Sequence, residues 1–94
     1  MAVNAAIVNS KSNVYDGVMT EEEWSDETKR LLRAEMTRRG VTYEQLSEKL
    51  ATIGINDTSV NIRNKVARGR FSAAFLIQCL TAMGAQTLRL TQSD

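Results

Sequence analysis

The side chains best suited to specific recognition lie close together between Asp57 and Arg70, on a segment predicted to be helical. Asn61 and Asn64 each carry an amide whose paired donor and acceptor match the edge that adenine shows in the major groove of DNA. Arg63 and Lys65 carry donors that match guanine. Two asparagines inside a helix lower its intrinsic stability, which indicates that their amides have a role, although ordinary surface polarity is the alternative.

Further polar side chains at both ends of this segment suit contacts with DNA. Thr58 and Ser59, at the predicted start of the helix, can reach bases or phosphates. The bases best suited to phosphates are Lys49, Arg68 and Arg70. Four bases stand against one acid between residues 57 and 70. The segment therefore predicts a surface for a polyanion, and the alternative is a solvated helix face with surface ion pairs.

The same sequence carries little that would support catalysis. It has no histidine, no glycine-rich phosphate loop and no spaced set of metal ligands. Its one cysteine, Cys79, lies in an apolar stretch, so no internal disulfide can form and a buried structural thiol in a reducing compartment is predicted. We therefore expect no enzyme activity, no metal and no cofactor.

Length and composition predict one small all-helical domain. The chain has 94 residues, of which 43% are apolar and 24% charged, and it contains no proline. A chain this short cannot bury two independent cores of useful size. Its leucine, alanine, glutamate and arginine content after Thr20 favours helices.

The formal net charge of +1 conceals an uneven distribution of charges along the chain. Six of the eleven acids lie between Asp16 and Glu27, and from Thr28 onward eleven bases stand against five acids. A basic body is compatible with a polyanionic partner, although mixed surface charge is common in proteins without one.

The first 19 residues show no helical period and predict a flexible N-terminal arm before a domain at residues 20–94. Residues 2–8 are apolar enough to form a short strand or to dock on a partner, which is the alternative. No run is long enough to cross a bilayer, and the start lacks the features of a signal peptide. We expect a cytoplasmic protein without a membrane partner.

Two capping boxes predict where the first two helices begin. Thr20 with Glu23 starts a helix that ends at Gly40, and Thr42 with Gln45 starts a second one that ends at Gly54. The predicted apolar stripes are Trp24, Leu31, Leu32 and Met36 in the first helix and Leu46, Leu50 and Ile53 in the second. Trp24 is expected to be a core residue or an interface anchor.

Two more helices are predicted before a short tail. The third starts at a cap among Asn56, Asp57 and Thr58 and ends at Gly69, and its inward candidates are Val60, Val66 and Ala67. The fourth starts at Ser72, is strongly apolar and ends at Gly84. The alternation in residues 87–90 suits either a short strand or one further helical turn.

Residues in the second to fourth predicted helices resemble a known family. The matching residues are Thr42, Tyr43, Glu44, Gln45, Leu46, Ser47, Glu48, Lys49, Leu50, then Arg68, Gly69, Arg70, Met83 and Gly84. This stretch resembles the lambda-repressor-like (Xre-type) helix-turn-helix domains, over about residues 31–90, and it is also similar to bacterial proteins assigned to a domain of unknown function. The resemblance implies a compact bundle of four to five helices in which Thr42 and Tyr43 contact phosphates and residues 58–65 face the major groove.

Two features depart from that family. The segment from Gly54 to Gly69 is longer than is usual there, and Tyr43 stands where a glutamine is common. Tyrosine can still donate a hydrogen bond from its hydroxyl, but with a different reach. The lengthened segment leaves open which side chains of the third helix face DNA.

Together these observations predict a sequence-specific regulator of transcription that binds double-stranded DNA as a homodimer through Trp24, the N-terminal arm or residues 87–90. The alternative is a protein-binding adaptor or an antitoxin-like partner with the same fold, which would use the acidic residues 21–27 or the tail at residues 88–90 as its contact.

Overall fold

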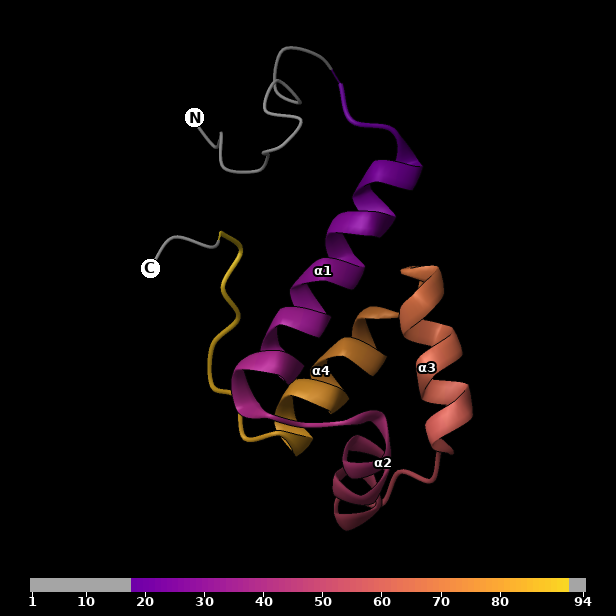
Figure 1. Cartoon of the computed structure of the whole chain (residues 1–94), viewed down its shortest axis with the longest axis vertical. Coiled ribbons are helices and arrows are strands. Elements are labelled where there is room, and N and C mark those ends of the chain that lie inside the picture. Colours follow the sequence, from indigo (N-terminus) through magenta and orange to yellow (C-terminus); the bar gives the residue numbers. More distant parts are fainter. Residues whose placement is uncertain (1–17, 92–94) are drawn as a thin grey trace.

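The computed structural model describes residues 18–91, which form four helices and no strand (Figure 1). These helices are α1 (Glu21–Arg39), α2 (Tyr43–Thr52), α3 (Ser59–Arg68) and α4 (Ala73–Ala82). The all-helical class predicted from the sequence is confirmed. Most of the predicted N-terminal arm, including the alternative strand at residues 2–8, lies outside the described residues.

Each helix begins at a hydroxyl side chain that accepts a hydrogen bond from the backbone three residues later. The caps are Thr20, Thr42, Thr58 and Ser72. Both predicted capping boxes are present, because the side chains of Glu23 and Gln45 also accept from the backbone of their cap residues, at 2.9 Å in each case. Such pairs satisfy backbone N–H groups that have no partner inside the helix.

The end of α3 is held tightly against α1. Gly69, which follows α3, has a φ of +66°, a left-handed conformation that glycine adopts without a steric penalty. A Cβ atom added to Gly69 would lie 2.3 Å from the carbonyl oxygen of Ser25 in α1. Glycine is therefore required here both for the backbone conformation and for the close approach of the two helices.

Nine buried apolar side chains from all four helices and the residue after α4 form the core. They are Leu32, Met36, Leu46, Leu50, Ile62, Val66, Phe75, Cys79 and Met83. Among the helices, α2 packs on α3 and α4, and α1 packs on the same two helices. The prediction that Cys79 is a buried thiol is confirmed, since the residue is fully buried and burial raises the pKa of the thiol to about 12.

One charged side chain, Glu35, is buried beside this core. It is 2% exposed, and its carboxylate oxygens lie 3.2 Å from Arg38 and 3.4 Å from Arg39. The side chains of Arg38 and Arg39 are 39% and 33% exposed, so their guanidinium groups bring the ion pair to the surface. Within the described residues, no helix is long and apolar enough to cross a lipid bilayer.

For several residues, the prediction from the sequence that they face the core is wrong. Trp24 is 54% exposed and not part of the core, because the first turns of α1 extend past the other helices (Figure 1), and its alternative role as an interface anchor stays a prediction. Ile53 follows the last residue of α2 and is 43% exposed. In α3, Val60 and Ala67 are exposed, whereas Ile62 and Val66 are fully buried.

Residues 85–91 form neither the short strand nor the additional helical turn that the sequence suggested. The tail runs back along α1 (Figure 1), where the Arg30 guanidinium donates a hydrogen bond of 3.3 Å to the carbonyl oxygen of Leu90. Leu90 itself is 64% exposed.

Candidate functional site

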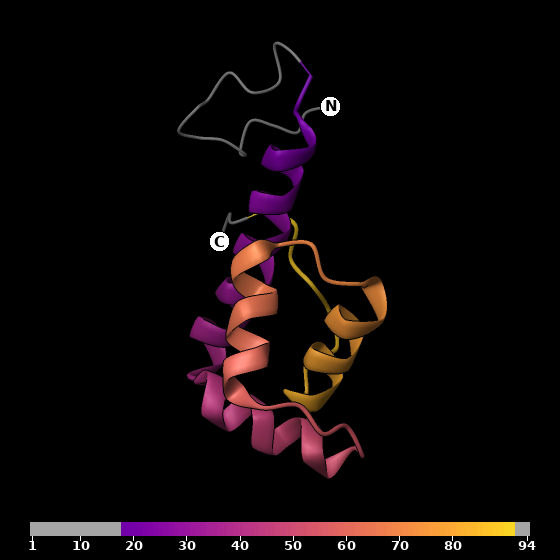
Figure 2. The ribbon, with the colours of Figure 1, turned by 90° about the vertical axis from the view of Figure 1, so that its right-hand side faces the viewer.

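The outward side of α3 is the most accessible helical surface that carries the predicted recognition residues (Figure 2). Asn61 and Asn64 are both exposed there, together with Val60, which is 57% exposed. Ile62 and Val66 face the core, so the side chains two positions away from them, Val60 and Asn64, lie on the opposite side of the helix and project away from the body. The structure thus brings the two asparagines together on one open face, with an apolar side chain between them and the start of the helix.

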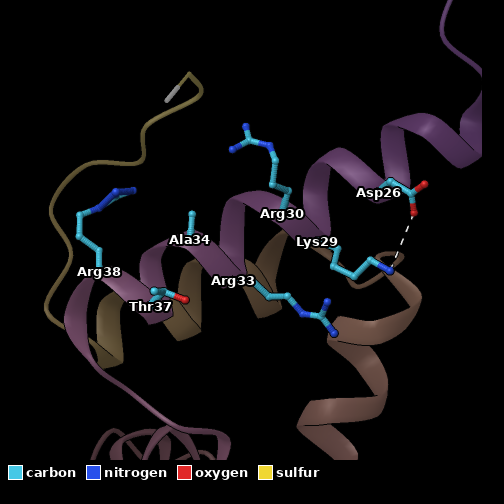
Figure 3. A pocket seen from close by; sticks show the side chains of 7 residues that line it. All are labelled: Asp26, Lys29, Arg30, Arg33, Ala34, Thr37 and Arg38. Atoms are coloured by element: carbon cyan, nitrogen blue, oxygen red, sulfur yellow. Dashed lines mark ion pairs between the residues drawn. The ribbon is translucent and has the colours of Figure 1, made fainter. Parts of the chain in front are cut away.

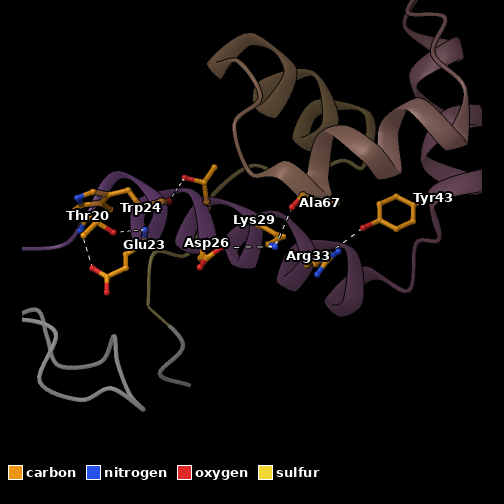
Figure 4. Close-up of polar contacts among 9 residues, drawn as sticks. Thr20, Glu23, Trp24, Asp26, Lys29, Arg33, Tyr43 and Ala67 are labelled. Atoms are coloured by element: carbon orange, nitrogen blue, oxygen red, sulfur yellow. Dashed lines mark hydrogen bonds and ion pairs between the residues drawn. The ribbon is translucent and has the colours of Figure 1, made fainter.

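Tyr43, the first residue of α2, connects α3 with α1 through two arginines. The Arg63 guanidinium of α3 lies over the Tyr43 ring, 5.2 Å from its centroid, and lies 3.6 Å from the Glu44 carboxylate. From α1, Arg33 Nε donates a hydrogen bond of 3.3 Å to the Tyr43 hydroxyl (Figure 4). We call these four residues, Arg33, Tyr43, Glu44 and Arg63, the tyrosine cluster. It places two guanidinium groups beside the outward side of α3.

Lys65 lies on a different side of α3 from the asparagines. Its ammonium group is 2.7 Å from Asp57 Oδ2 and lies 4.7 Å from the centroid of the Phe75 ring in α4. Asp57 is only 10% exposed, so this ion pair is shielded from solvent more than the Arg63–Glu44 pair, whose side chains are 48% and 65% exposed. The contacts of Lys65 are those of a residue that joins α3 to the body.

The predicted hydroxyl residues are used as helix caps. Thr42 accepts from the backbone N–H of Gln45 at 3.1 Å, and Thr58 accepts from that of Asn61 at 3.0 Å. A capping hydroxyl still has its own proton to donate to a phosphate. Ser59, the first residue of α3, is half-buried and so less accessible than Thr58.

The link between α2 and α3 is fixed by one short hydrogen bond. Ser47 in α2 donates to the carbonyl oxygen of Asp57 at 2.6 Å. A shallow pocket follows this link on the surface, lined by Ser47, Ala51, Asn56, Asp57, Thr58 and Asn61. The start of α3 is thereby held at a fixed distance from α2, with Asn61 at the edge of the pocket.

Cationic side chains also follow the end of α3. Arg68 and Arg70 are exposed, and they border a shallow pocket together with Lys65 and Phe71. Neither guanidinium group makes an ion pair or hydrogen bond with another residue in the part of the chain that the structure describes. Lys49 instead borders a pocket beside Arg39 and Met83, away from α3.

Two residues of this surface were missed by the sequence prediction. Val60 was assigned to the core, although Ile62, Val66 and Gly69 are spaced at i, i+4 and i+7 and so lie on one face, which is the buried one. Arg33 was counted only as a basic residue. No sequence signal links it to Tyr43, because that contact depends on how α1 crosses α2 and α3.

Within residues 18–91, no three side chains that could ligate a metal ion lie close together.

A family model described as "Domain of unknown function (DUF6471)" matches residues 24–88. No curated protein and no solved structure matches the chain. The matched segment begins at Trp24 in α1 and includes the whole of α2, α3 and α4.

Proposed function

The chain belongs to the family of proteins with the domain of unknown function DUF6471, and we propose that it is a sequence-specific protein that binds double-stranded DNA and regulates transcription by occupying an operator. In this proposal α2 and α3 are the two helices of a helix-turn-helix, and α3 enters the major groove. The family description assigns no activity, so the proposal depends on the surface of the molecule alone.

One observation carries the proposal, namely the open outward side of α3 with Val60, Asn61 and Asn64. An amide can pair with the N6 and N7 edge of adenine, and an exposed aliphatic side chain can contact the methyl group of thymine. All three side chains are exposed and lie within five residues of the start of the helix. The N-terminal part of such a helix is the part that reaches bases in this mode of docking.

The groups around this face suit the phosphates on both sides of a groove. On one side, the tyrosine cluster offers the Arg63 guanidinium group, and the hydroxyl of Thr42 caps the start of α2. On the other side, Arg68 and Arg70 follow the end of α3 with unengaged guanidinium groups in the described part of the chain. Arginine donors of this kind fix the position of a protein on DNA, whereas the base contacts supply the specificity.

The contacts of Lys65 argue for removing it from the set of base-reading residues. Reaching a guanine would require its ammonium group to leave Asp57 and the Phe75 ring, and Asp57 would then remain largely buried without its counter-ion. The proposed base-reading set is therefore Val60, Asn61 and Asn64, with Arg63 at its edge.

Selection of a random duplex library by the purified protein, at low and at physiological salt, tests the proposal. We expect enrichment of one motif that contains A·T pairs, and an affinity that falls steeply as salt rises, because phosphate contacts release counter-ions. No enrichment at either salt would contradict DNA recognition and would favour a protein-binding adaptor, whose apolar or mixed contacts depend much less on salt.

A further inference from the structure

The solvent-facing side of α1 has an unusual distribution of charge along its length. Its second half borders a shallow pocket in which Lys29, Arg30, Arg33 and Arg38 project around the short side chains of Ala34 and Thr37 (Figure 3). Asp26 lines the same pocket at its other end, 3.9 Å from the Lys29 ammonium group. The first half of this side carries the exposed acids Glu22, Glu23 and Asp26. One continuous helix face is therefore acidic where α1 extends past the body and basic where the other helices support it.

The dipole of α1 explains only the ends of this pattern. Acids in the first turn and bases in the last turn stabilise a helix, but this effect falls off within one turn. Asp26, Arg30 and Arg33 lie beyond the terminal turns of a helix that runs from residue 21 to 39. The charges in the middle of the face therefore call for a different explanation.

We propose that this face binds the same face of a second copy of the chain, with the two α1 helices antiparallel about a two-fold axis near Arg30. A two-fold interface must be complementary to itself, and an acidic half followed by a basic half meets that requirement in the antiparallel orientation only. Glu22 and Asp26 of one copy then lie opposite Thr37 and Arg33 of the other.

The dimensions and side chains of the face suit this pairing. A helix of 19 residues is about 28 Å long, so the acidic turns that project from one body reach the basic half of the other helix. Ala34 and Thr37 leave room between the long cationic side chains for the second helix to approach. Near the axis, each Arg30 lies 2.7 Å from the Glu27 of its own chain, which limits repulsion between the two copies.

A DNA phosphate backbone is the competing ligand for the basic pocket, and the acids on the same face argue against it. Glu22, Glu23 and Asp26 would repel a polyanion laid along α1, whereas they are the groups that a second basic half requires. The pairing does not depend on the proposed DNA binding. If both are correct, the dimer presents two α3 helices to paired half-sites.

Sedimentation of the full chain without DNA tests the proposal, with two charge-swap variants. Glu22→Lys with Asp26→Lys replaces two acids of this face with bases, and Arg33→Glu with Thr37→Glu places two acids in its basic half. We expect a wild-type dimer, dimerisation weakened about tenfold or more in each variant, and recovery of a dimer when the two variants are mixed, since opposite charges then face each other again. Circular dichroism confirms that each variant is folded.

A matched control changes the same number of charges elsewhere. Glu48→Lys with Thr52→Lys changes two exposed residues of α2 outside the tyrosine cluster and is expected to leave the dimer unchanged. A wild-type monomer at every concentration, or a dimer that both swaps leave intact, would overturn the proposal. So would a mixture of the two variants that stays monomeric. Loss of DNA affinity in an Arg33→Glu/Thr37→Glu variant that remains a dimer would assign the pocket to phosphates instead.

Discussion

The two sides of α3 differ in what holds their residues in place. On the inner side Ile62 and Val66 are fully buried, and Gly69 closes the helix against the Ser25 carbonyl. On the outer side Val60, Asn61 and Asn64 are exposed, and the asparagine side chains bind no other residue that the structure describes. Packing within the fold thus explains the residues on the inner side, whereas no contact within the described structure explains the residues on the outer side. This contrast is what points to a partner for the outer side.

The largest expected effect comes from adding a side chain at Gly69, where the end of α3 contacts α1. Gly69→Ala places a Cβ atom 2.3 Å from the Ser25 oxygen and forces alanine into the left-handed region. Strain and overpacking each cost about 1 to 3 kcal/mol, so we expect a loss of about 4 kcal/mol in the free energy of unfolding, measured by denaturant titration.

Gly40→Ala is the matched control for that substitution. Gly40 has the same φ of +66°, but nothing lies within 4 Å of the added Cβ atom. We expect a cost of only about 1 kcal/mol, from backbone strain alone. Equal losses in the two variants would show that the approach of α3 to α1 contributes nothing to the constraint on Gly69.

Truncating one apolar side chain on each side of α3 tests the contrast directly. Ile62→Ala removes a fully buried side chain and should cost about 3 kcal/mol of stability through lost burial and the cavity that remains. Val60→Ala, at a position that is 57% exposed, should change stability by less than about 0.5 kcal/mol. Thermal unfolding of both variants measures the difference. A similar loss in both would mean that Val60 packs on something in the folded protein, which would undermine its proposed role.

A smaller effect, on DNA affinity and not on stability, is expected at the centre of the outer side. Asn64→Ala should weaken binding to the selected motif by about 1 to 3 kcal/mol and relax the preference at one base pair. Fluorescence anisotropy with the motif and with single-base variants measures both. Gln86→Ala, which removes an exposed amide in the tail, should leave affinity unchanged. If Asn64→Ala weakened binding equally on every sequence, Asn64 would be a phosphate contact.

Helix starts could be predicted from the sequence because their interactions are local. Thr20 with Glu23 and Thr42 with Gln45 exchange hydrogen bonds across three residues, so spacing alone is sufficient to identify them. The same is true of Gly40 and Gly69, whose left-handed conformation follows from their position at a helix end.

The inward sides of the helices could be predicted less well because they depend on where other helices lie. α3 contains several apolar residues, and the buried position of Ile62 in place of Val60 is set by how the helix is rotated against α1 and α2. Trp24 fits the period of α1 but lies beyond the helices that could cover it (Figure 1). The alternation at residues 87–90 suggested a strand, yet the described tail has no strand beside it with which to pair.

The candidate site shows the same division between local and distant contacts. The exposed asparagines could be identified from residue type, whereas the engagement of Lys65 could not, because Asp57 is eight residues away and Phe75 belongs to α4. Arg63 and Lys65 looked equivalent as guanine readers in the sequence. Their contacts now separate them, since Arg63 lies over Tyr43 at the surface and Lys65 is drawn toward the body.

The smallest expected effect concerns Lys65, which lies between the inner and the outer side of α3. Lys65→Met keeps an aliphatic stem over Phe75 but leaves the Asp57 carboxylate without its counter-ion, so we expect a loss of about 1 kcal/mol in stability and little change in sequence preference. Arg68→Met, at an exposed position after which α3 ends, should leave stability unchanged and reduce DNA affinity uniformly, together with the slope of its salt dependence. Denaturant titration and binding at two salt concentrations separate the two variants. The opposite outcome, in which Lys65→Met alters base preference without loss of stability, would move Lys65 to the outer side and show that its ion pair opens when DNA binds.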